Sequence, residues 1–289
     1  MVKTVLSLAG DDFSKPVYGI HRLGIHFNST YIGLLVINKE QNKVAAFQLL
    51  EPEEQFNVAD GAAIRKMLDS LIAGHEWFSD NTITTTVLIP GNGFTLVPVE
   101  AYDSYNKEQL LEPQYQVQTS DIVFAEQLAD NPVMAVYTLP WGWSQQLRSH
   151  FTDLKLIHED VCWLNLAIST QGKNLPDKAA VLYVEPDKLK IQLIEKGKLL
   201  YFNSFYFQDN YDILYYLQLA LSQFGMGTAA TDILLAGTGY DDLALETFLK
   251  QYTLSINPLK FPFFNTLPVA MRKYYPTHYL ALFSTAICG

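Results

Sequence analysis

Three short β-rich runs followed by an amphipathic helix occur in both halves of this sequence, and this repeat restricts the fold more than any other feature. In the first half the runs cover residues 21–28, 31–38 and 43–50, with turn-forming residues between them. In the second half they read AAVLYVE, KLKIQLIE and KLLYFNSFYF. Apolar, β-branched and aromatic runs bounded by turn residues are typical of strands. The sequence therefore predicts a β-β-β-helix-β unit that is built twice.

The second turn of each unit supports the repeat. Asn42 stands in the first unit where Gly197 stands in the second, and both residue types tolerate the positive φ of tight hairpin turns. Helices are predicted over residues 60–78, with Asp60 at the start, and over residues 209–226. Two unrelated α/β domains are the alternative, because one sequence does not prove a duplication.

Further elements follow from local patterns. The sequence predicts a strand at TITTTVLIP, a turn at GNG (residues 91–93), a helix near KEQLLE, and a strand pair at DIVFAEQL and PVMAVYTLP. WSQQLRSHF is predicted as a helix, and LKLIHEDVCWLNLAIST as a strand that runs into a helix. The polar segment QGKNLPDK, residues 171–178, is predicted as a linker. It divides the chain into an N-terminal lobe, residues 1–170, and a C-terminal lobe, residues 171–289.

Composition limits the possible functions. The chain has 289 residues, 49% of them hydrophobic, so it has the material for a large core. Its net charge of −10 without a basic cluster argues against nucleic-acid binding. No stretch approaches the ~20 apolar residues of a membrane-spanning helix. Cys162 and Cys288 lie far apart and do not suggest a disulfide framework. We expect a cytoplasmic protein without a membrane span.

The repeated unit, which ends in a strand, a Gly-containing loop and a helix in its second copy, resembles the actin-like ATPase superfamily. The type IV pilus and cell-division actin homologues of bacteria are the nearest in style. GFTLVP (residues 93–98), GKLLYFNSF (197–205) and ILYYLQLALSQFG (213–225) together resemble an uncharacterised bacterial domain-of-unknown-function family with this fold. The resemblance covers roughly residues 20 to 265. It implies an α/β, two-lobed, ribonuclease H-like duplicated fold with mixed sheets flanked by helices.

In that superfamily each lobe carries an Asp-x-Gly loop whose Asp helps to hold Mg²⁺ and whose Gly lets backbone N–H groups approach phosphate. In this chain the resemblance places His26 at the first Asp position and Asn28, followed by Ser29, at the first Gly position. In the second loop it places Tyr183 and Glu185 at these positions. A carboxylate in the second loop repels phosphate, and Pro186 lacks a backbone donor. Both loops therefore read as degenerate.

A third element is better preserved. ILLAGTG, residues 233–239, resembles the adenosine motif, in which small residues let the base and ribose pack on the loop. The resemblance makes Gly237, Thr238 and Gly239 candidate nucleotide contacts. A strand, Gly loop and helix also occur in many α/β proteins that bind no nucleotide.

Two other groups of residues are candidates for function. His158-Glu159-Asp160 could supply metal ligands or an acid/base pair, but neighbouring side chains point to different faces, so we expect a strand-to-helix junction. Trp141 and Trp143 could be packing residues or anchors for a partner, and the same holds for FPFFNTLP, residues 261–268.

These observations lead to a functional hypothesis with two alternatives. We expect a degenerate, non-hydrolysing actin-like protein that acts by protein–protein interaction or self-association, with no catalytic residues and no metal or other cofactor. The first alternative is a genuine ATP-binding actin-like ATPase with divergent phosphate loops, which would use ATP and Mg²⁺. The second is a metal-dependent hydrolase around His158.

Overall fold

A computed structural model describes most of the chain. The described residues are 2–10, 13–28, 30–52, 61–91, 93–129, 131–174, 177–239, 244–259, 267, 269–272 and 277–288. Asp60, Ser29 and most of the FPFFNTLP segment lie outside them, so the predictions made for these residues stay predictions. Within the described residues, no helix has the length and apolar character needed to cross a membrane.

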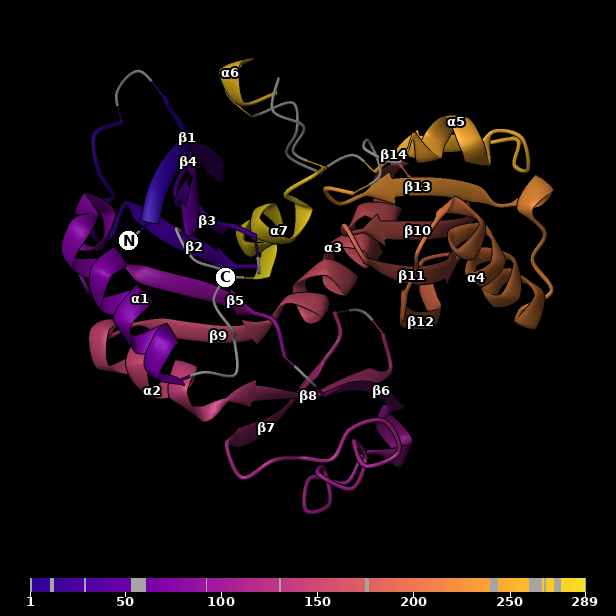
Figure 1. Ribbon diagram of the computed structural model, residues 1–289, viewed down its shortest axis with the longest axis horizontal. Coiled ribbons are helices and arrows are strands. Elements are labelled where there is room, and N and C mark those ends of the chain that lie inside the picture. The colour runs from indigo at the N-terminus through magenta and orange to yellow at the C-terminus, as the bar shows by residue number, and fades with distance from the viewer. Residues whose placement is uncertain are drawn as a thin grey trace.

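The first lobe is built on a six-stranded mixed sheet of order β1-β4-β3-β2-β5-β9. Strands β1 to β4 pair antiparallel in that sheet, whereas β5 runs parallel to β2 and β9 runs parallel to β5. The strands are β1 (Val2–Ala9), β2 (His21–Phe27), β3 (Ile32–Asn38), β4 (Lys43–Pro52), β5 (Thr84–Ile89) and β9 (Leu154–His158). Helices α1 (Gly61–Gly74) and α2 (Trp141–His150) and the short η1 (Glu76–Phe78) belong to this lobe (Figure 1).

The second lobe is built on a five-stranded sheet of order β12-β11-β10-β13-β14. Its strands are β10 (Lys178–Val184), β11 (Lys188–Glu195), β12 (Lys198–Tyr206), β13 (Asp232–Ala236) and β14 (Ile256–Pro258). Its helices are α4 (Asn210–Gln223), η3 (Thr228–Ala230) and α5 (Leu245–Leu249). This order matches β4-β3-β2-β5-β9 of the first sheet strand for strand, with the same directions. The predicted two-lobed mixed α/β fold is therefore confirmed.

The turns that suggested the repeat have the expected backbone. Asn42 has a φ of 48° and Gly197 a φ of 80°, each in the tight turn between the second and third strands of its unit. Lys196 also has a positive φ, of 49°, so this two-residue turn has the geometry that matches the right-handed twist of the strands it joins.

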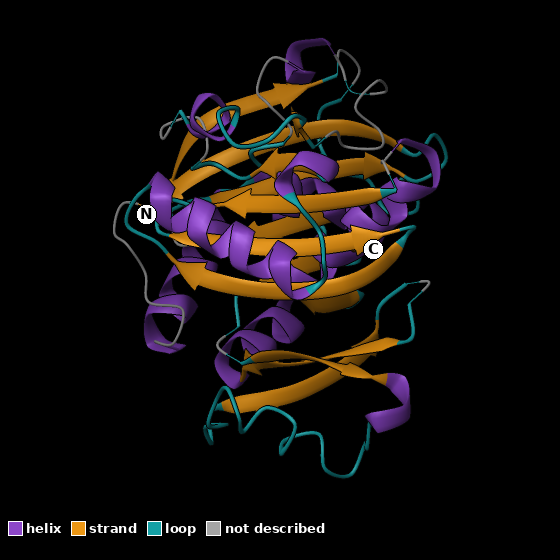
Figure 2. Ribbon diagram, turned by 90° about the vertical axis from the view of Figure 1, so that its right-hand side faces the viewer, coloured by secondary structure: helices purple, strands orange, loops and turns teal. Residues whose placement is uncertain are grey.

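A small antiparallel sheet of order β6-β8-β7 projects from the first lobe (Figure 2). It contains β6 (Phe94–Pro98), which leads into η2 (Val99–Ala101), and the predicted strand pair β7 (Asp121–Gln127) and β8 (Val133–Pro140). The helix predicted near KEQLLE is wrong: residues 103–114 form consecutive turns, with Leu111 buried against the sheet. Such a short segment gains too few hydrogen bonds to form a helix unless packing supports it.

Two other elements differ from the sequence-based expectation. Helix α3 (Glu159–Asn174) contains the first four residues of the predicted linker, and the last residue of that linker, Lys178, begins β10. Strand β1 was not predicted, because it is an edge strand with mostly exposed side chains and weak alternation. It pairs with β4 through a register that shifts between Thr4 and Leu6.

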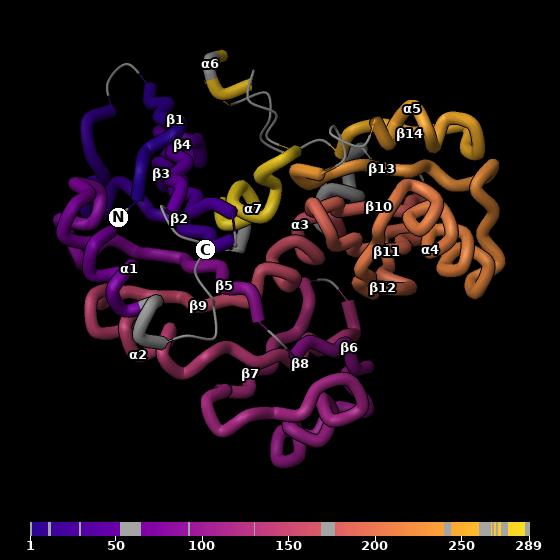
Figure 3. The backbone as a smooth tube through the Cα atoms, in the orientation of Figure 1, coloured from indigo at the N-terminus to yellow at the C-terminus, as the bar shows by residue number. Residues whose placement is uncertain are grey.

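Helices α3 and α7 (Leu280–Cys288) lie between the two sheets, and the C-terminal segment returns to the first lobe after α6 (Val269–Arg272) (Figure 3). Helix α7 packs against α3 and against β2, β3 and β5. Its close approach needs the glycines of these strands: a Cβ at Gly24 would stand 2.1 Å from Thr285 Oγ1, and one at Gly33 2.6 Å from Leu282. The lobe boundary at residues 170/171 stays a prediction.

The larger of the hydrophobic cores spans both lobes. It joins residues of the first sheet and of α3 and α7 to Val181, Tyr183 and Leu234 of the second sheet. The other face of the second sheet has a core of its own with α4 and α5, to which Leu217 and Leu245 contribute. The ends of β2 and β10 are therefore held against each other by packed helices.

Candidate functional site

The two predicted phosphate loops meet at the junction of the lobes. Asn28 follows β2 directly and Glu185 follows β10 directly, so the equivalent strands of the two sheets present them. The side-chain amide of Asn28 donates a hydrogen bond from Nδ2 to Oε1 of Glu185 over 3.1 Å. Oδ1 of Asn28 accepts hydrogen bonds from the backbone and the hydroxyl of Thr30. The side chains of the two loops are thus bonded to each other across the lobes.

His26 connects the first loop to α3. It is fully buried near the end of β2, and Nε2 of its ring lies 3.0 Å from Oε2 of Glu159, the first residue of α3. Nδ1 lies 2.9 Å from the hydroxyl of Tyr31. The carboxylate of Glu159 accepts from Nε2–H, and the Tyr31 hydroxyl shares the second hydrogen bond with Nδ1. The ring orientation is fixed from both sides.

Lys190 stands at the centre of the junction. It lies on β11 in register with Tyr183 of β10, and only 2% of its surface is exposed. Its Nζ atom is 2.6 Å from Oε1 of Glu159, 2.6 Å from Oδ1 of Asp160 and 3.9 Å from Oε2 of Glu185. A buried ammonium is stable only when charges and acceptors surround it, and here three carboxyl groups do so.

These contacts close a ring across the two lobes. The backbone N–H of Asn28 donates to the carbonyl of Tyr31, so the series of contacts returns to the hairpin from which it starts. We call this ring, together with Asp160, the cross-lobe network. Its members are Tyr31, His26, Glu159, Asp160, Lys190, Glu185 and Asn28.

Burial and charge act on these groups in opposite directions. Burial alone raises the pKa of Glu159, but the Lys190 ammonium and the hydrogen bond from His26 bring this pKa well below its usual value. Burial lowers the pKa of Lys190, yet its carboxylate neighbours raise it well above the ordinary lysine value. Glu185 differs, because burial raises its pKa and the more distant Lys190 offsets only part of the rise. The ion pair of Glu159 and Lys190 is thus the stable centre, and Glu185 is its weakly compensated neighbour.

The His158-Glu159-Asp160 segment forms the predicted strand-to-helix junction, but the expectation that its side chains diverge is only partly correct. Glu159 and Asp160 are the first two residues of α3, and the carboxylates of both contact the Lys190 ammonium. The ring of His158 lies between two other groups: its Nε2 is 3.1 Å from the backbone nitrogen of Gly91, and its Nδ1 is 3.8 Å from Oδ2 of Asp160. Burial lowers the pKa of His158.

Metal binding at this junction would require several ligands to converge. Among the described residues no group of three His, Cys, Asp or Glu side chains is arranged to hold a metal ion. The carboxyl groups that converge here do so on the ammonium of Lys190, which stands between Glu159 and Asp160.

The adenosine-like loop is packed directly on the second phosphate loop. A Cβ at Gly237 would stand 2.1 Å from the carbonyl oxygen of Val184, and one at Gly239 2.5 Å from that of Glu185. Gly237 also has a φ of 100°, which favours glycine. The N–H of Gly237 donates to Thr277, and the N–H of Gly239 donates to Val184. Close packing by itself accounts for these glycines, and a role in nucleotide binding stays a prediction.

The fold implies ATP with Mg²⁺, so the described loop residues can be compared with what a triphosphate needs. Phosphate binding in such loops uses free N–H donors and a carboxylate that holds the metal. Here Asn28 Nδ2 is bonded to Glu185, and the buried Lys190 is held by carboxylates. Glu185 itself adds a carboxyl group to this loop. These residues do not fit a triphosphate.

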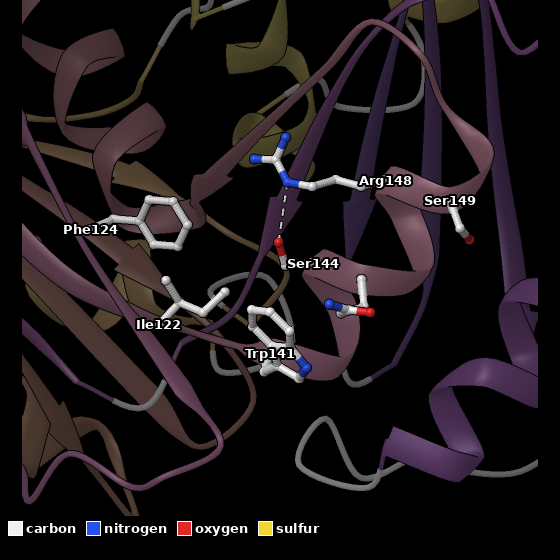
Figure 4. Close-up of a pocket in the computed structure, with 7 residues that line it drawn as sticks. Ile122, Phe124, Trp141, Ser144, Arg148 and Ser149 are labelled. Atoms are coloured by element: carbon white, nitrogen blue, oxygen red, sulfur yellow. Dashed lines mark hydrogen bonds between the residues drawn. The ribbon is translucent and has the colours of Figure 1, made fainter.

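The two tryptophans that followed a predicted strand have different environments. Trp143 is completely buried in the core, where its ring centre lies 4.4 Å from that of Phe27. Trp141, at the start of α2, is 53% exposed. It lies over a surface hollow beside β7 (Figure 4).

Lys190 is the member of the cross-lobe network that no signal in the sequence identified. In KLKIQLIE the lysines and glutamine alternate with apolar residues, a pattern that predicts one face in water. In the structure both faces are covered, and Gln192 is fully buried as well. Only the contact with Glu159 and Asp160, about thirty residues earlier in the chain, identifies the lysine, and no local pattern contains it.

Comparison with solved structures identifies the fold class of this chain. A Bacteroides thetaiotaomicron VPI-5482 protein with actin-like ATPase fold and unknown function superposes with a TM-score of 0.75 at 17% identity, over 93% of this chain and 96% of that chain. A structure of the PilM–PilN type IV pilus biogenesis complex superposes with a TM-score of 0.65 at 11% identity, over 92% of this chain and 98% of that one. The chain therefore has the actin-like ATPase fold.

A family model gives a more specific assignment than the fold. Residues 19–256 match DUF3822, which is described as a protein of unknown function, and the chain belongs to this family. No curated protein matches the sequence.

Proposed function

We propose that this chain is a non-hydrolysing actin-like protein that acts by binding another protein or a second copy of itself. The observation that carries the proposal is the cross-lobe network. It places side chains of both lobes, bonded to one another, where the two phosphate loops of an actin-like ATPase meet. The bond between Asn28 and Glu185 then links the lobes without a nucleotide.

Electrostatics support this proposal. Three carboxyl groups surround one ammonium in the network, so the junction has no spare positive charge for a triphosphate. Bringing phosphate oxygens next to Glu185 would add like-charge repulsion. Moving Lys190 towards a phosphate would leave Glu159 and Asp160 buried without a counter-ion, which costs several kcal/mol.

The structural comparison supports the protein-binding half of the proposal. The PilM–PilN structure is a complex of two proteins, so one protein of this fold works as part of an assembly. A fold that supports many functions does not identify the partner of this chain.

Nucleotide binding tests the proposal directly. The purified full chain would be heated with and without ATP and Mg²⁺, and phosphate release would be measured on the same samples. A ligand present at 100 times its Kd stabilises the folded state by about 2.7 kcal/mol, which is readily detected as a higher Tm. We expect no change in Tm with millimolar ATP and no phosphate release.

A variant separates the proposal from its rival, an ATP-binding protein with divergent loops. Glu185→Gln removes the carboxylate of the second loop and leaves an amide that can still accept the bond from Asn28. If the wild-type chain shows a rise in Tm with ATP, or phosphate release that Glu185→Gln changes, the chain is a nucleotide-binding protein and the proposal is wrong.

A further inference from the structure

One side of helix α2 faces a hollow on the surface of the first lobe. Trp141, Ser144, Gln145, Arg148 and Ser149 follow one another at helical spacing along this side of α2. Ile122 and Phe124 of β7 line the opposite side (Figure 4). We call this hollow, of about 450 Å³, the α2–β7 hollow. Its size suits a few side chains rather than a whole domain.

The apolar side chains of the hollow differ in exposure: Ile122 and Phe124 are half-buried, and Trp141 is exposed. Trp141 is 53% exposed, whereas Trp143 and Leu147 on the other side of α2 are completely buried. The buried side fixes the helix, so Trp141 is presented to solvent in a defined place. Exposed tryptophans of this kind contribute strongly to protein interfaces, because they bury a large area and lose little conformational entropy.

The hollow has a single charged side chain. Arg148 is the one charged residue that lines it, and its Nε atom donates a hydrogen bond to Ser144 Oγ over 3.3 Å. Figure 4 shows its guanidinium extending from α2 toward Phe124. Among the described residues no carboxylate forms an ion pair with it. A guanidinium in this state is suited to bind a carboxylate through two parallel hydrogen bonds.

We propose that the α2–β7 hollow binds a short segment of another protein in which a carboxylate lies next to a large apolar side chain. The apolar side chain packs between Trp141 and Phe124, and the carboxylate pairs with Arg148. Gln145 and Ser149 at the rim offer hydrogen bonds to the backbone of the segment. This inference rests on the proposed function and names the chemistry of the partner.

Peptide selection tests this inference without knowledge of the natural partner. A phage library of random dodecapeptides would be selected on the immobilised full chain in the absence of nucleotide. We expect the selected sequences to be enriched in Asp or Glu beside Leu, Ile, Phe or Trp. The most frequent dodecapeptide would then be synthesised, and its Kd measured by calorimetry.

Matched variants show where the peptide binds. Arg148→Gln and Trp141→Ala should each raise the Kd about tenfold or more, the loss typical of an interface hot spot. Two substitutions at exposed sites away from the hollow are the controls, Arg65→Gln on α1 and Tyr215→Ala on α4. Each should change the Kd less than twofold. The Kd of Arg148→Lys should lie between those of wild type and Arg148→Gln, because lysine keeps the charge and loses the paired hydrogen-bond geometry. Tm values of all variants would show that each is folded.

Several outcomes would overturn the inference. These are a selection that yields no binding peptide, selected peptides without an acidic residue, and an unchanged Kd in Arg148→Gln. A chain that dimerises in light scattering, with a dimer that Trp141→Ala abolishes, would show that a second copy occupies the hollow. The nucleotide experiment is independent: peptide binding by a chain that also hydrolyses ATP would refute the proposed function and leave the α2–β7 hollow as a binding site.

Discussion

Lys190 determines the chemistry at the junction of the lobes. A lysine that is 2% exposed is stable only because Glu159 and Asp160 lie 2.6 Å from its ammonium. Desolvation of this ammonium is unfavourable, but its removal would leave the buried carboxylates of Glu159 and Asp160 without a counter-ion.

We predict that Lys190→Met destabilises the chain by about 3–5 kcal/mol, as removal of one partner from a buried ion pair does. The control is Lys250→Met, because Lys250 also lies 2.6 Å from a carboxylate, that of Glu246, but both side chains are largely exposed. The control should cost less than about 1 kcal/mol. Urea unfolding measures both values, and equal losses would show that burial of Lys190 is not what matters.

Glu185 should make the folded state less stable as pH rises. Its pKa is raised in the folded state by burial, so the unfolded chain loses this proton at lower pH than the folded chain does. As pH rises from the usual carboxyl value of about 4.3 through the raised folded value, the folded state therefore loses stability. Glu159 has a lowered pKa and contributes stability that is lost as pH falls, so it acts in the opposite direction.

We predict that Glu185→Gln removes this loss of stability at higher pH. The stability of the variant relative to wild type should increase as pH rises through the raised folded pKa of Glu185 and then level off. Urea unfolding at a series of pH values between about 4 and 8 measures the difference. Glu246→Gln, at an exposed site on α5, is the control and should show almost no trend. A stability difference independent of pH would contradict the prediction.

At the level of elements, the approach of α7 to the first sheet determines how the lobes are joined. Helix α7 lies over β2 and β3 because Gly24 and Gly33 leave room for Thr285 and Leu282. The equivalent of Gly33 in the second sheet is Lys190, since Gly33 pairs with His26 as Lys190 pairs with Tyr183. The same strand position therefore admits a helix in one lobe and supplies the network's charge in the other.

We predict that Gly24→Ala destabilises the chain by about 1–3 kcal/mol, the usual cost of overpacking a core. The added Cβ would stand 2.1 Å from Thr285 Oγ1, so α7 would have to shift. Hydrogen exchange should then become faster in residues 280–288 than in α4. Gly227→Ala is the control, because a Cβ there meets nothing within 4 Å. Equal stability of Gly24→Ala and Gly227→Ala would argue against tight packing of α7.

At the level of the whole molecule, local signals predicted the repeated architecture well. The strands at 21–27, 32–38 and 43–52 and their counterparts at 178–206 were predictable because turn residues separate clear β-rich runs. The repeat itself was visible in the matched turns at Asn42 and Gly197, whose backbone conformations agree. The edge strand β1 was not predictable, since its alternation is weak and its pairing with β4 connects residues far apart in the chain.

Strand runs, turns and loop residues are local features, so the sequence alone predicted the fold class, the repeat and the absence of the Asp-x-Gly pattern at His26 and Tyr183. The residues that form the junction, and the charge that it holds, follow from tertiary packing and from no local pattern. Glu159 lies in α3, Lys190 lies in β11 and Glu185 follows β10, so their contacts depend on how the sheets and helices pack. The same is true of Trp141 and Trp143, which are two residues apart in sequence and lie on opposite sides of one helix, one in solvent and one in the core.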